Sequence, residues 1–417
     1  MASGRASHGG PLHLLIVSNT HDSAHVSGAD RDWVNLLNAL GPERVRVTWA
    51  GARGAEVLRR YLDARLEARF VDLNGYQFYE LFHDKMYRRR TLWSWAGIAK
   101  SYAASLRGPL GLLGRALAAD PPDVVVTNTS VVLVGAAYAL RRRLPHVWCV
   151  KEFLDPRVRA CRTYARLIER LSDAVVVPSE AMAGAFSTRV RVLRDGSDIA
   201  AVRAGVRADR AQVLESLGLP ADQLLVAQVG AVSRAKGQHV TAEAFALLAK
   251  EGRRPSSLLF LGAAAPGQEE ELRAALAGAP AGWQASVRFA EFGPGDFSHL
   301  AAADVVVHPS VLPDPYPNAV REALILGRPV VAARTGGIPQ LVAEGETGLL
   351  VEPGDAPALA AALKSLLDAP ERRARMGEAA LRFAAEQLDV HACKRAFQDL
   401  LAEVVRRRGR AFDRAPK

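Results

Sequence analysis

The chain has 417 residues, of which 49% are hydrophobic and 24% charged, and this length is too great for one ordinary hydrophobic core. No apolar run reaches the roughly 18 residues that span a bilayer, and the polar start at residues 1–10 lacks the apolar core of a signal peptide. Cys149, Cys161 and Cys393 are spaced for neither a disulfide framework nor a zinc site. We therefore predict a cytoplasmic globular protein with two domains.

The net charge of +10 is concentrated in the first half of the chain. Residues 1–200 contain 28 Lys and Arg against 19 Asp and Glu, whereas residues 201–417 contain 26 against 25. Such an imbalance predicts an anionic partner for the first half, such as a membrane surface. The alternative is an arginine-rich composition on solvated faces.

Short β-branched runs alternate with helical patterns in the first half. Seven strands are expected there, at 12–18, 44–50, 68–73, 123–128, 146–152, 173–179 and 189–193. A polar stretch around 197–220 follows, and the alternation then restarts. Apolar strands that alternate with helices are typical of parallel sheets covered on both faces.

Six further strands are expected in the second half, at 224–232, 257–262, 286–292, 304–310, 329–333 and 348–353. The sequence thus predicts an α/β chain with two doubly wound, Rossmann-like domains, at 1–200 and 201–390, facing a central cleft. A final helix at 391–417 is expected to return to the N-terminal domain. Ligands of such folds bind beyond the carboxyl ends of the strands.

Residues 313–332, PDPYPNAVREALILGRPVVA, place two carboxylates beside a helix start. Asp314 lies in the loop after a predicted strand, Asn318 is expected to cap the next helix, and Glu322 falls in that helix's first turns. Ionised carboxylates accept two hydrogen bonds each, which suits the neighbouring hydroxyls of a sugar or ribose. Alternatively, Asp314 is a turn residue and Glu322 complements the helix dipole.

Glycine-bearing turns follow several predicted strands. GAVSRAKGQ (230–238) offers Gly230 and Gly237 for a close approach of the backbone to an anion, with charge from Arg234 and Lys236. A basic β–α turn without a ligand is the alternative. TGGIPQ (335–340) brings Gly336 and Gly337 before another helix, expected over 338–344.

The first half offers weaker candidates. Gly28 starts a helix after a long loop that contains His25, and we expect this loop to approach an acceptor or a phosphate. Asn128 and Glu152 stand at the carboxyl ends of predicted strands and are further acceptor-side candidates. The pair Asp30 and Asp32 forms an Asp-x-Asp pattern, but it falls at a helix start, so no metal site is predicted.

At this point the second half resembles a known family. The segments GAVSRAKG, DPYPNAVREALILGRPVVA, TGGIPQ and GETGLLVEPGD occur in the order and at the spacing found in family 4-type retaining glycosyltransferases, glycosyltransferases group 1, which have the GT-B fold. The similarity is strong over 225–356 and weaker in the first half. It implies metal-independent transfer of a sugar from a nucleotide-diphosphate sugar to an acceptor hydroxyl, without a cofactor.

The resemblance also implies roles for individual residues. Glu322 would hold the ribose hydroxyls, Asp314 would contact the transferred sugar, and Lys236 would bind the diphosphate. Gly230, Arg234, Gly237, Asn318, Gly336 and Gly337 would complete the donor site. The acceptor would be a lipid or polysaccharide of the cell envelope, or a small molecule.

The chain departs from the family pattern at several positions. Asp314 stands where the family usually has Glu, Ala231 where it often has Arg, and Gln340 where it has Glu. Histidine is frequent in the family at places that Val126, Asn128 and Cys149 occupy here. These departures bear on the donor sugar and on acceptor-side catalysis.

The segment 85–117 is basic, bears tryptophans and is amphipathic, which suits a peripheral membrane surface. The alternative is a helix packed on the sheet with exposed arginines. Two other functions compete with the transferase: a sugar-nucleotide epimerase of the same fold, and a nucleic-acid-binding protein. The latter should show aromatic residues interleaved with basic ones on one face, whereas the arginine clusters 88–90 and 141–143 flank ordinary helical patterns, so we do not expect it.

Overall fold

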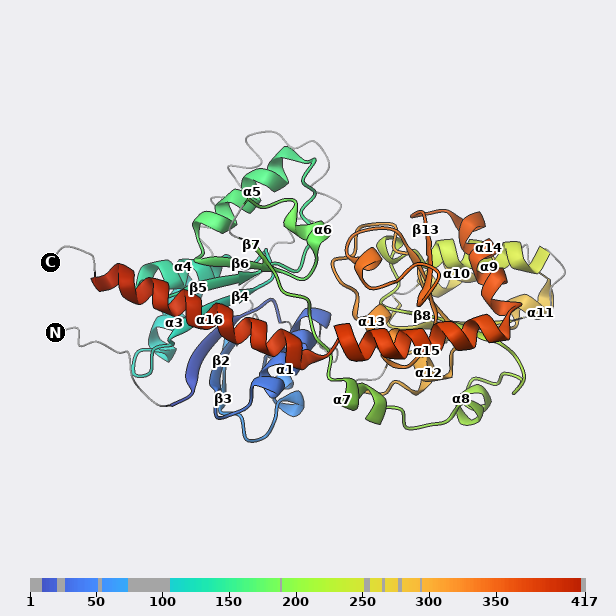
Figure 1. Ribbon diagram of the computed structural model, residues 1–417, viewed down its shortest axis with the longest axis horizontal. Helices are drawn as coiled ribbons and strands as arrows, with labels where there is room; N and C mark the ends of the chain where they lie inside the picture. The colour runs from blue at the N-terminus through green and yellow to red at the C-terminus, as the bar shows by residue number, and fades with distance from the viewer. Residues whose placement is uncertain are drawn as a thin grey trace. The chain divides into compact units, whose positions relative to one another are not determined.

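The computed structural model describes residues 10–20, 27–51, 55–73, 106–187, 190–250, 256–264, 267–276, 280–292 and 295–413. The chain forms two compact units, each with a parallel sheet between helices (Figure 1). Unit 1 comprises Met1–Gly196 and Val390–Lys417, and unit 2 comprises Ser197–Asp389.

The sheet of unit 1 has seven strands in the order β3-β2-β1-β4-β5-β6-β7, all pairs parallel. The strands are β1 (Leu12–Val17), β2 (Val45–Gly51), β3 (Ala68–Asp72), β4 (Val124–Asn128), β5 (His146–Cys149), β6 (Ala174–Val177) and β7 (Val190–Val192). Side chains alternate between its faces, so Leu14 and Ile16 pack in one core while Leu15 and Val17 pack in another.

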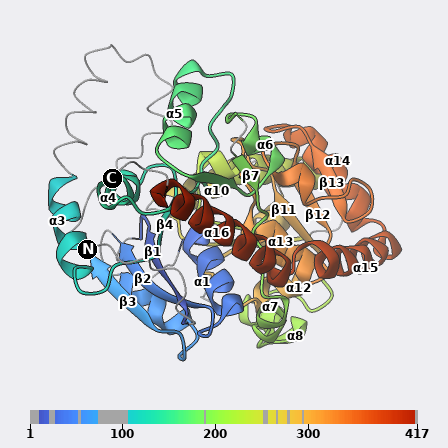
Figure 2. The same ribbon diagram turned by 60° about the vertical axis from the view of Figure 1, so that its left-hand side comes forward.

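Helices cover both faces of this sheet. The described ones are α1 (Gly28–Leu40), the 3-10 helix η1 (Ala55–Tyr61), α3 (Arg107–Ala116), α4 (Leu133–Arg142), α5 (Arg159–Arg170), α6 (Glu180–Ala183) and α16 (Val390–Asp413). The last helix, α16, lies against α1 in both ribbon views (Figures 1 and 2). Phe397 on α16 meets Trp33 on α1 edge to face, with ring centroids 5.2 Å apart.

The sheet of unit 2 has six parallel strands in the order β10-β9-β8-β11-β12-β13. They are β8 (Leu225–Val229), β9 (Ser257–Leu261), β10 (Val287–Ala290), β11 (Val305–His308), β12 (Val330–Ala333) and β13 (Gly348–Val351). All thirteen strands predicted from the sequence are therefore present, and the α/β class is confirmed. Most end earlier than predicted; β5, for example, stops at Cys149 rather than at residue 152.

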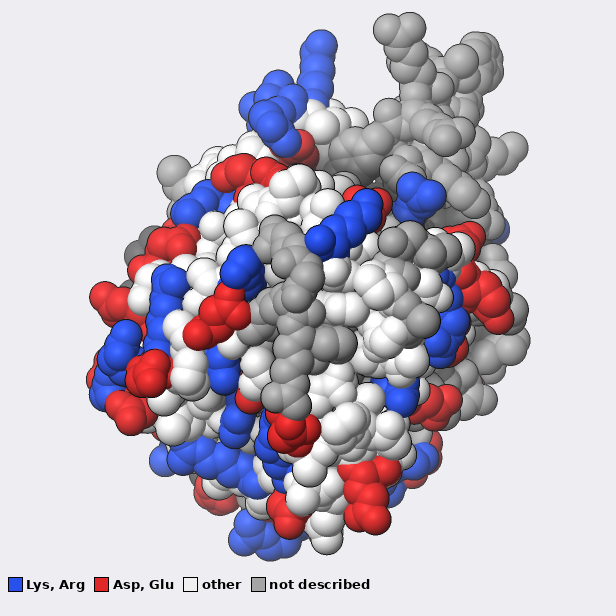
Figure 3. All heavy atoms as spheres, turned by 90° about the vertical axis from the view of Figure 1, so that its right-hand side faces the viewer, with Lys and Arg blue, Asp and Glu red and all other residues white. Residues whose placement is uncertain are grey.

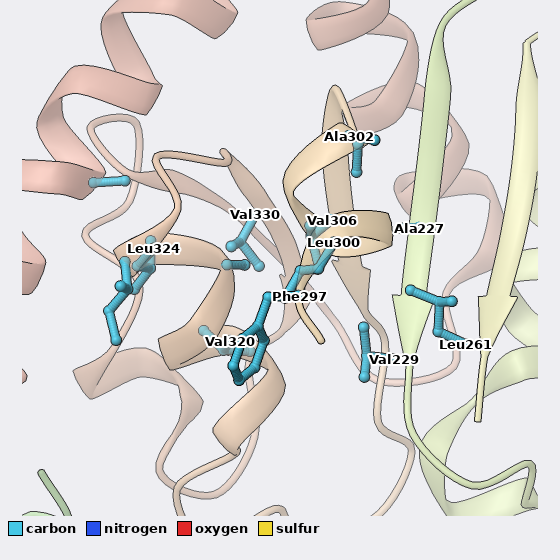
Figure 4. Close-up of a cluster of buried hydrophobic side chains, with 14 of the residues drawn as sticks. Ala227, Val229, Leu261, Phe297, Leu300, Ala302, Val306, Val320, Leu324 and Val330 are labelled. Carbon is cyan, nitrogen blue, oxygen red and sulfur yellow. The ribbon is translucent and has the colours of Figure 1, made fainter. Parts of the chain in front are cut away.

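Two helical layers cover the sheet of unit 2. One contains α7 (Ile199–Ala204), α8 (Arg210–Ser216), α12 (Ser298–Ala302), α13 (Asn318–Ile325), the 3-10 helix η3 (Ile338–Gln340) and α15 (Pro370–Gln387). The other contains α9 (Gln238–Lys250), α10 (Gln268–Ala275), α11 (Ala281–Gln284) and α14 (Ala356–Leu367). Leu300 lies beside Val306 of the sheet, and Phe297, Val320 and Leu324 belong to the same buried cluster (Figure 4).

Two local predictions need correction. The helix expected over 338–344 is only the 3-10 turn η3, which begins with Ile338 and Pro339 and ends at Gln340. Helix α13 begins at Asn318, so Pro317 rather than Asn318 occupies the capping position. Proline is suited to this border because it has no backbone N–H and its φ is already helical.

Each sheet has a topological switch point, where the chain continues from two neighbouring strands toward opposite edges of the sheet. It lies between β1 and β4 in unit 1 and between β8 and β11 in unit 2. Loops leaving the carboxyl ends of such strands part from each other and leave room for a ligand. These two switch points are therefore where the site should be sought.

The charged side chains on the face seen in Figure 3 are mixed: Lys and Arg are interspersed with Asp and Glu and form no single patch.

Candidate active site

The loop after β8 leads from Gly230 through the 3-10 helix η2 (Arg234–Lys236) to Gly237. The N–H of Gly230 donates to Leu261 and that of Gly237 to Arg234, so both amides are already used within the protein. These glycines serve the shape of the loop: their φ angles are +136° and +73°. Binding of an anion is left to the Lys236 side chain and to other amides of the loop, while the Arg234 side chain is exposed.

Gly237 also allows a close approach between two loops. A Cβ at this position would lie 2.1 Å from the carbonyl oxygen of Pro309, just after β11. Two glutamines fix the loop from below: the amide of buried Gln228 donates to the Lys236 carbonyl at 2.9 Å, and that of Gln238 to the Ala231 carbonyl at 3.1 Å. The position of Lys236 therefore depends on contacts across the switch point.

The loop after β11 carries Asp314, which is only 8% exposed. Its Oδ2 atom lies 2.5 Å from the Lys236 Nζ and 3.1 Å from the His308 Nε2. The Ser310 hydroxyl lies 3.1 Å from the same histidine nitrogen. The structure thus brings together the predicted Lys236 and Asp314, and it adds His308, which the sequence did not single out.

The environment of Asp314 keeps its carboxylate ionised. Burial alone would raise its pKa, but the charge of Lys236 and the hydrogen bond from His308 together hold the pKa well below its usual range. Burial and the nearby Lys236 lower the pKa of His308, so its ring is neutral at neutral pH. The neutral ring can bond to a carboxylate only by donating, so this network assigns the proton to Nε2.

Glu322 lies in the second turn of α13, which begins at Asn318 just after the loop that carries Asp314, and it is only 6% exposed. The neighbouring Arg321 is 1% exposed and donates to the side-chain oxygen of Asn318 and to the hydroxyl of Ser197 at 3.1 Å. Its guanidinium also lies over the Tyr316 ring, 5.5 Å from the centroid. The side-chain oxygen of Asn318 is thus bound by Arg321.

Gly336 and Gly337 pack directly onto the backbone of Asp314. A Cβ on Gly336, whose φ is +57°, would lie 2.1 Å from the Asp314 carbonyl oxygen. The N–H of Gly337 donates to that oxygen at 2.8 Å. These glycines therefore place the Asp314 backbone, in addition to any contact that they make with a ligand.

In unit 1 a buried polar network occupies the switch point between β1 and β4. Asp30 in the first turn of α1 is 3% exposed and accepts hydrogen bonds from Thr20 at 3.2 Å, Ser27 at 2.9 Å and Asn128 at 3.3 Å. Burial raises the pKa of Asp30 despite these bonds. Gly28 is the first residue of α1, where Ser27 caps the helix, and His25 lies outside the described residues.

Glu152 lies two strands from β1, beyond the end of β5. Its Oε2 atom accepts the N–H of Ser130 at 2.6 Å, and the Ser130 carbonyl in turn accepts the hydroxyl of Tyr164. Burial raises the pKa of Glu152, and the Ser130 bond only partly offsets this effect. The hydrogen bond to Glu152 thus comes from an uncharged backbone N–H group, which does not fully offset the effect of burial on its pKa.

The same edge of the unit 1 sheet carries buried polar atoms that have no hydrogen-bond partner among the described residues: Asn19 Oδ1, Asn128 Oδ1, Thr129 Oγ1 and Ser179 Oγ. They follow the ends of β1, β4 and β6. Thr129 has a φ of +80°, which is strained for a β-branched residue. Strain and unsatisfied polar groups at a strand end are typical of binding sites.

A separate hollow in unit 1 surrounds Lys151. Its lining includes Asp32, Cys149, Asp195 and Cys393. The lysine pairs with Asp195 and lies 3.8 Å from Asp32, and although burial would lower its pKa, these carboxylates raise it to about 12. Because Lys151 is already paired with both carboxylates, we interpret this cluster as a structural ion-pair network that holds the chain near the end of β7 rather than as a binding site.

Other expectations concern metals and membranes. Among the described residues, no group of three or more His, Cys, Asp and Glu could hold a metal ion. None of the helices in the described part of the chain combines the length and the apolar sequence that crossing a bilayer requires. Most of the basic, tryptophan-bearing segment 85–117 lies outside the described residues, which resume at 106 and include α3.

The sequence was compared with known proteins. The sequence model of the family Glycosyl transferases group 1 matches residues 209–383. A protein named D-inositol 3-phosphate glycosyltransferase from Corynebacterium efficiens is 36% identical over 200 residues, 47% of each chain. D-inositol 3-phosphate glycosyltransferase 2 from Catenulispora acidiphila is 36% identical over 213 residues, 48% of each chain. The chain thus spans about half the length of the relatives that it matches.

Solved structures resemble the chain over nearly its whole length. HepE from Anabaena, solved in complex with UDP and glucose, has a TM-score of 0.72 at 21% identity and covers 94% of this chain and 100% of its own. Sucrose-phosphate synthase from Thermosynechococcus elongatus has a TM-score of 0.73 at 18% identity, with coverages of 94% and 99%. These likenesses confirm the GT-B class, with two Rossmann-like domains in one chain.

Proposed function

We propose, from the match of residues 209–383 to the sequence model of the glycosyl transferases group 1 family, that this chain is a glycosyltransferase. It transfers a sugar from a nucleoside-diphosphate sugar to an acceptor hydroxyl. The observation that carries the proposal is the contact between Lys236 and the buried Asp314 at the switch point of unit 2. A cation suited to a diphosphate and a carboxylate suited to sugar hydroxyls meet there, where ligands of such sheets bind.

The chemistry requires stabilisation of the leaving nucleoside diphosphate. Negative charge develops on its phosphate oxygens as the bond to the sugar breaks, and a preorganised cation lowers that barrier. Lys236, held from both sides of the switch point, supplies the positive charge without a metal ion. Asp314 accepts hydrogen bonds from the transferred sugar, and it remains ionised for this role.

Other donor-side residues support these two. Glu322, buried in the first turns of α13, binds the ribose hydroxyls. Gly230 and Gly237 shape the phosphate loop, and Arg234 adds charge at its exposed side. Gly336 and Gly337 hold the backbone of Asp314, and Asn318 orients Arg321 beside Glu322.

The acceptor binds at the carboxyl edge of the unit 1 sheet, where Asn128, Glu152 and the start of α1 at Gly28 lie. The buried hydroxyl and amide atoms there are suited to a hydroxyl-bearing molecule. Retention of the anomeric configuration is proposed from the resemblance of residues 225–356 to retaining enzymes. The comparisons give no support to the epimerase alternative, which shares the same fold.

The proposed acceptor bears a hydroxyl group and is an envelope lipid, a polysaccharide or a small molecule. The names of the relatives include an inositol phosphate acceptor, which makes inositol 3-phosphate one compound to test. Contact with an anionic membrane and a cytoplasmic location stay predictions.

The proposal is tested by calorimetric binding of UDP, GDP, ADP, TDP and CDP in the presence of EDTA. We expect one diphosphate to bind the wild type, and Lys236→Ala and Glu322→Ala each to weaken that binding. Lys364→Ala removes an exposed lysine of α14 and should leave it unchanged. If none of the five diphosphates binds, the donor site is wrongly assigned.

A further inference from the structure

The two groups that a donor needs are bound to each other in this structure. Lys236 Nζ, which the diphosphate requires, lies 2.5 Å from Asp314 Oδ2, which the sugar requires. Lys236 retains 38% side-chain exposure, whereas Asp314 has 8%. The lysine can therefore turn toward a ligand, but the carboxylate cannot follow it.

Separation of this pair has a physical cost. A buried carboxylate that loses its only cation is strongly disfavoured unless hydrogen bonds replace the lost interaction. Asp314 retains such a bond, because the His308 Nε2 contacts the same Oδ2 atom at 3.1 Å. His308 is 2% exposed and sits at the last position of β11, so it is fixed by the sheet.

We infer, on the basis of the proposed function, that His308 is a positioning residue that holds the Asp314 carboxylate in place while Lys236 leaves it for the diphosphate of the donor. The Lys236–Asp314 ion pair is then the resting state of the donor site. Donor binding exchanges one anionic partner of Lys236 for another, and the sugar hydroxyls join His308 as donors to Asp314.

The chemistry of the pair explains why a histidine suits this position. A second cation in place of His308 would repel Lys236 at rest. The neutral ring donates one hydrogen bond without adding charge, and Ser310, 3.1 Å from the same nitrogen, helps to orient it. The aspartate side chain is one methylene shorter than that of glutamate, so the Asp314 carboxylate stays close to the end of β11. His308, the last residue of that strand, is therefore within hydrogen-bond distance of it.

The test is a double-mutant cycle on the affinity for UDP, measured by calorimetry in EDTA. His308→Leu should weaken UDP binding about tenfold, the equivalent of one hydrogen bond to a charged group, because Lys236 then leaves a poorly held carboxylate. Asp314→Asn should strengthen UDP binding severalfold, because UDP has no sugar and Lys236 has lost its competing partner. In the Asp314→Asn background, His308→Leu should have no further effect.

Equal weakening by His308→Leu in both backgrounds would show a purely structural role and overturn the inference. The same conclusion would follow if His308→Leu left UDP binding unchanged in the wild-type background. His299→Leu, a matched substitution in α12 of the same unit, serves as control and should not alter the affinity. His308→Gln keeps a side-chain donor and should recover part of the loss.

A second measurement needs no ligand and separates this inference from the proposed function. In the Lys236→Met variant, nitrogen NMR of the His308 ring should still show the proton on Nε2, because Asp314 still accepts it. A change of tautomer in that variant would show that Lys236, not His308, holds the Asp314 carboxylate in position. This result would overturn the inference even if UDP binds. Absence of UDP binding with the tautomer retained would instead count against UDP as the nucleotide of the proposed donor.

Discussion

At the switch point of unit 2, the buried carboxylate of Asp314 contacts a lysine and a histidine, whereas at the switch point of unit 1 the buried carboxyl group of Asp30 accepts hydrogen bonds from hydroxyl and amide groups. The pKa of Asp314 is lowered and the pKa of Asp30 is raised. The two sheets share the order of their first six strands, so topology alone does not set the chemistry. The side chains that the loops bring to the same place decide it.

The difference has consequences for binding. In unit 2 a partly exposed lysine and a buried carboxylate are paired before a ligand arrives, which favours exchange of the lysine's partner for an anionic ligand. In unit 1 burial raises the pKa of Asp30 and Glu152, and several buried oxygens have no hydrogen-bond partner in the part of the chain that the structure describes. Such a site is suited to hydroxyl groups, which can both donate and accept.

The largest effect is expected from the lysines of the two units. Lys236→Ala should lower kcat/KM for the donor on the order of 10²–10³-fold, because the charge on the leaving diphosphate loses a preorganised partner. Its effect on thermal stability should be small, since the side chain is 38% exposed. Release of the nucleoside diphosphate from the donor measures the first quantity, and calorimetric unfolding the second.

Lys151→Met is the contrasting change in unit 1. It removes the lysine partner of the largely buried Asp195 and Asp32, and breaking such a cluster costs on the order of 3 kcal/mol. Stability should therefore fall while the affinity for UDP is retained at temperatures below unfolding. If Lys236→Ala lowered stability without lowering kcat/KM, or Lys151→Met weakened UDP binding without lowering stability, the distinction between a ligand-binding and a structural lysine would be wrong.

The second effect concerns the placement of Asp314 by Gly336. Gly336→Ala adds a methyl group 2.1 Å from the Asp314 carbonyl oxygen and should displace the carboxylate, so donor turnover should fall by about tenfold or more. Gly354→Ala is a matched control: its φ of +81° is equally unfavourable for alanine, but a Cβ there meets nothing within 4 Å. Both variants should lose about 1–2 kcal/mol of stability from the backbone, and only Gly336→Ala should lose activity.

On the donor side, many features of unit 2 could be predicted from the sequence. The strands and the segments around Lys236, Asp314 and Glu322 follow from periodicity, turn residues and the family resemblance. The contact of Lys236 with Asp314 could not be read from the residues alone, because it depends on β8 and β11 being neighbours, which is a property of strand order. His308 was not among the predicted site residues, because a lone histidine near a strand end is more often structural and its sequence says nothing of the loop that follows.

The acceptor side was less accessible to sequence reasoning for a different reason. Asp30 was interpreted as a structural residue at a helix start, and its contact with Asn128 joins positions 98 residues apart. The strained φ of Thr129, just after the strand predicted at 123–128, has no compositional signal, since a β-branched residue does not favour positive φ. These features arise from tertiary packing, which overrides local preference.

A smaller effect tests the raised pKa of Glu152. With the folded pKa above its ordinary value of 4.5, the folded state holds more protons than the unfolded state between these two values. The free energy of unfolding therefore falls as pH rises through this interval, and the ionised carboxylate is destabilising above it. Glu152→Gln should raise the melting temperature at pH 8 and have progressively less effect toward pH 4.

Melting curves of the wild type and Glu152→Gln from pH 4 to pH 8 measure this difference. Glu243→Gln, at an exposed position of α9, is the control and should show no pH-dependent gain. A uniform loss of stability in Glu152→Gln at every pH would mean that the carboxylate itself stabilises the end of β5, as Asp314 is stabilised by its cation.

The smallest effect is expected from relief of backbone strain at Thr129. Thr129→Gly and Arg143→Gly both place glycine at a positive φ, +80° and +57°, and each should change stability by less than about 1 kcal/mol, since relief of strain is offset by the greater freedom of the unfolded chain. Arg143 ends α4 and is exposed, so its variant should leave kinetics unchanged. Thr129→Gly removes a buried hydroxyl at the proposed acceptor edge and should raise the KM for whichever acceptor supports turnover severalfold, with kcat less affected. Equal kinetics in the two variants would show that Thr129 holds its strained backbone for the sheet alone, and the partnerless oxygens beside it would then need an explanation other than the acceptor.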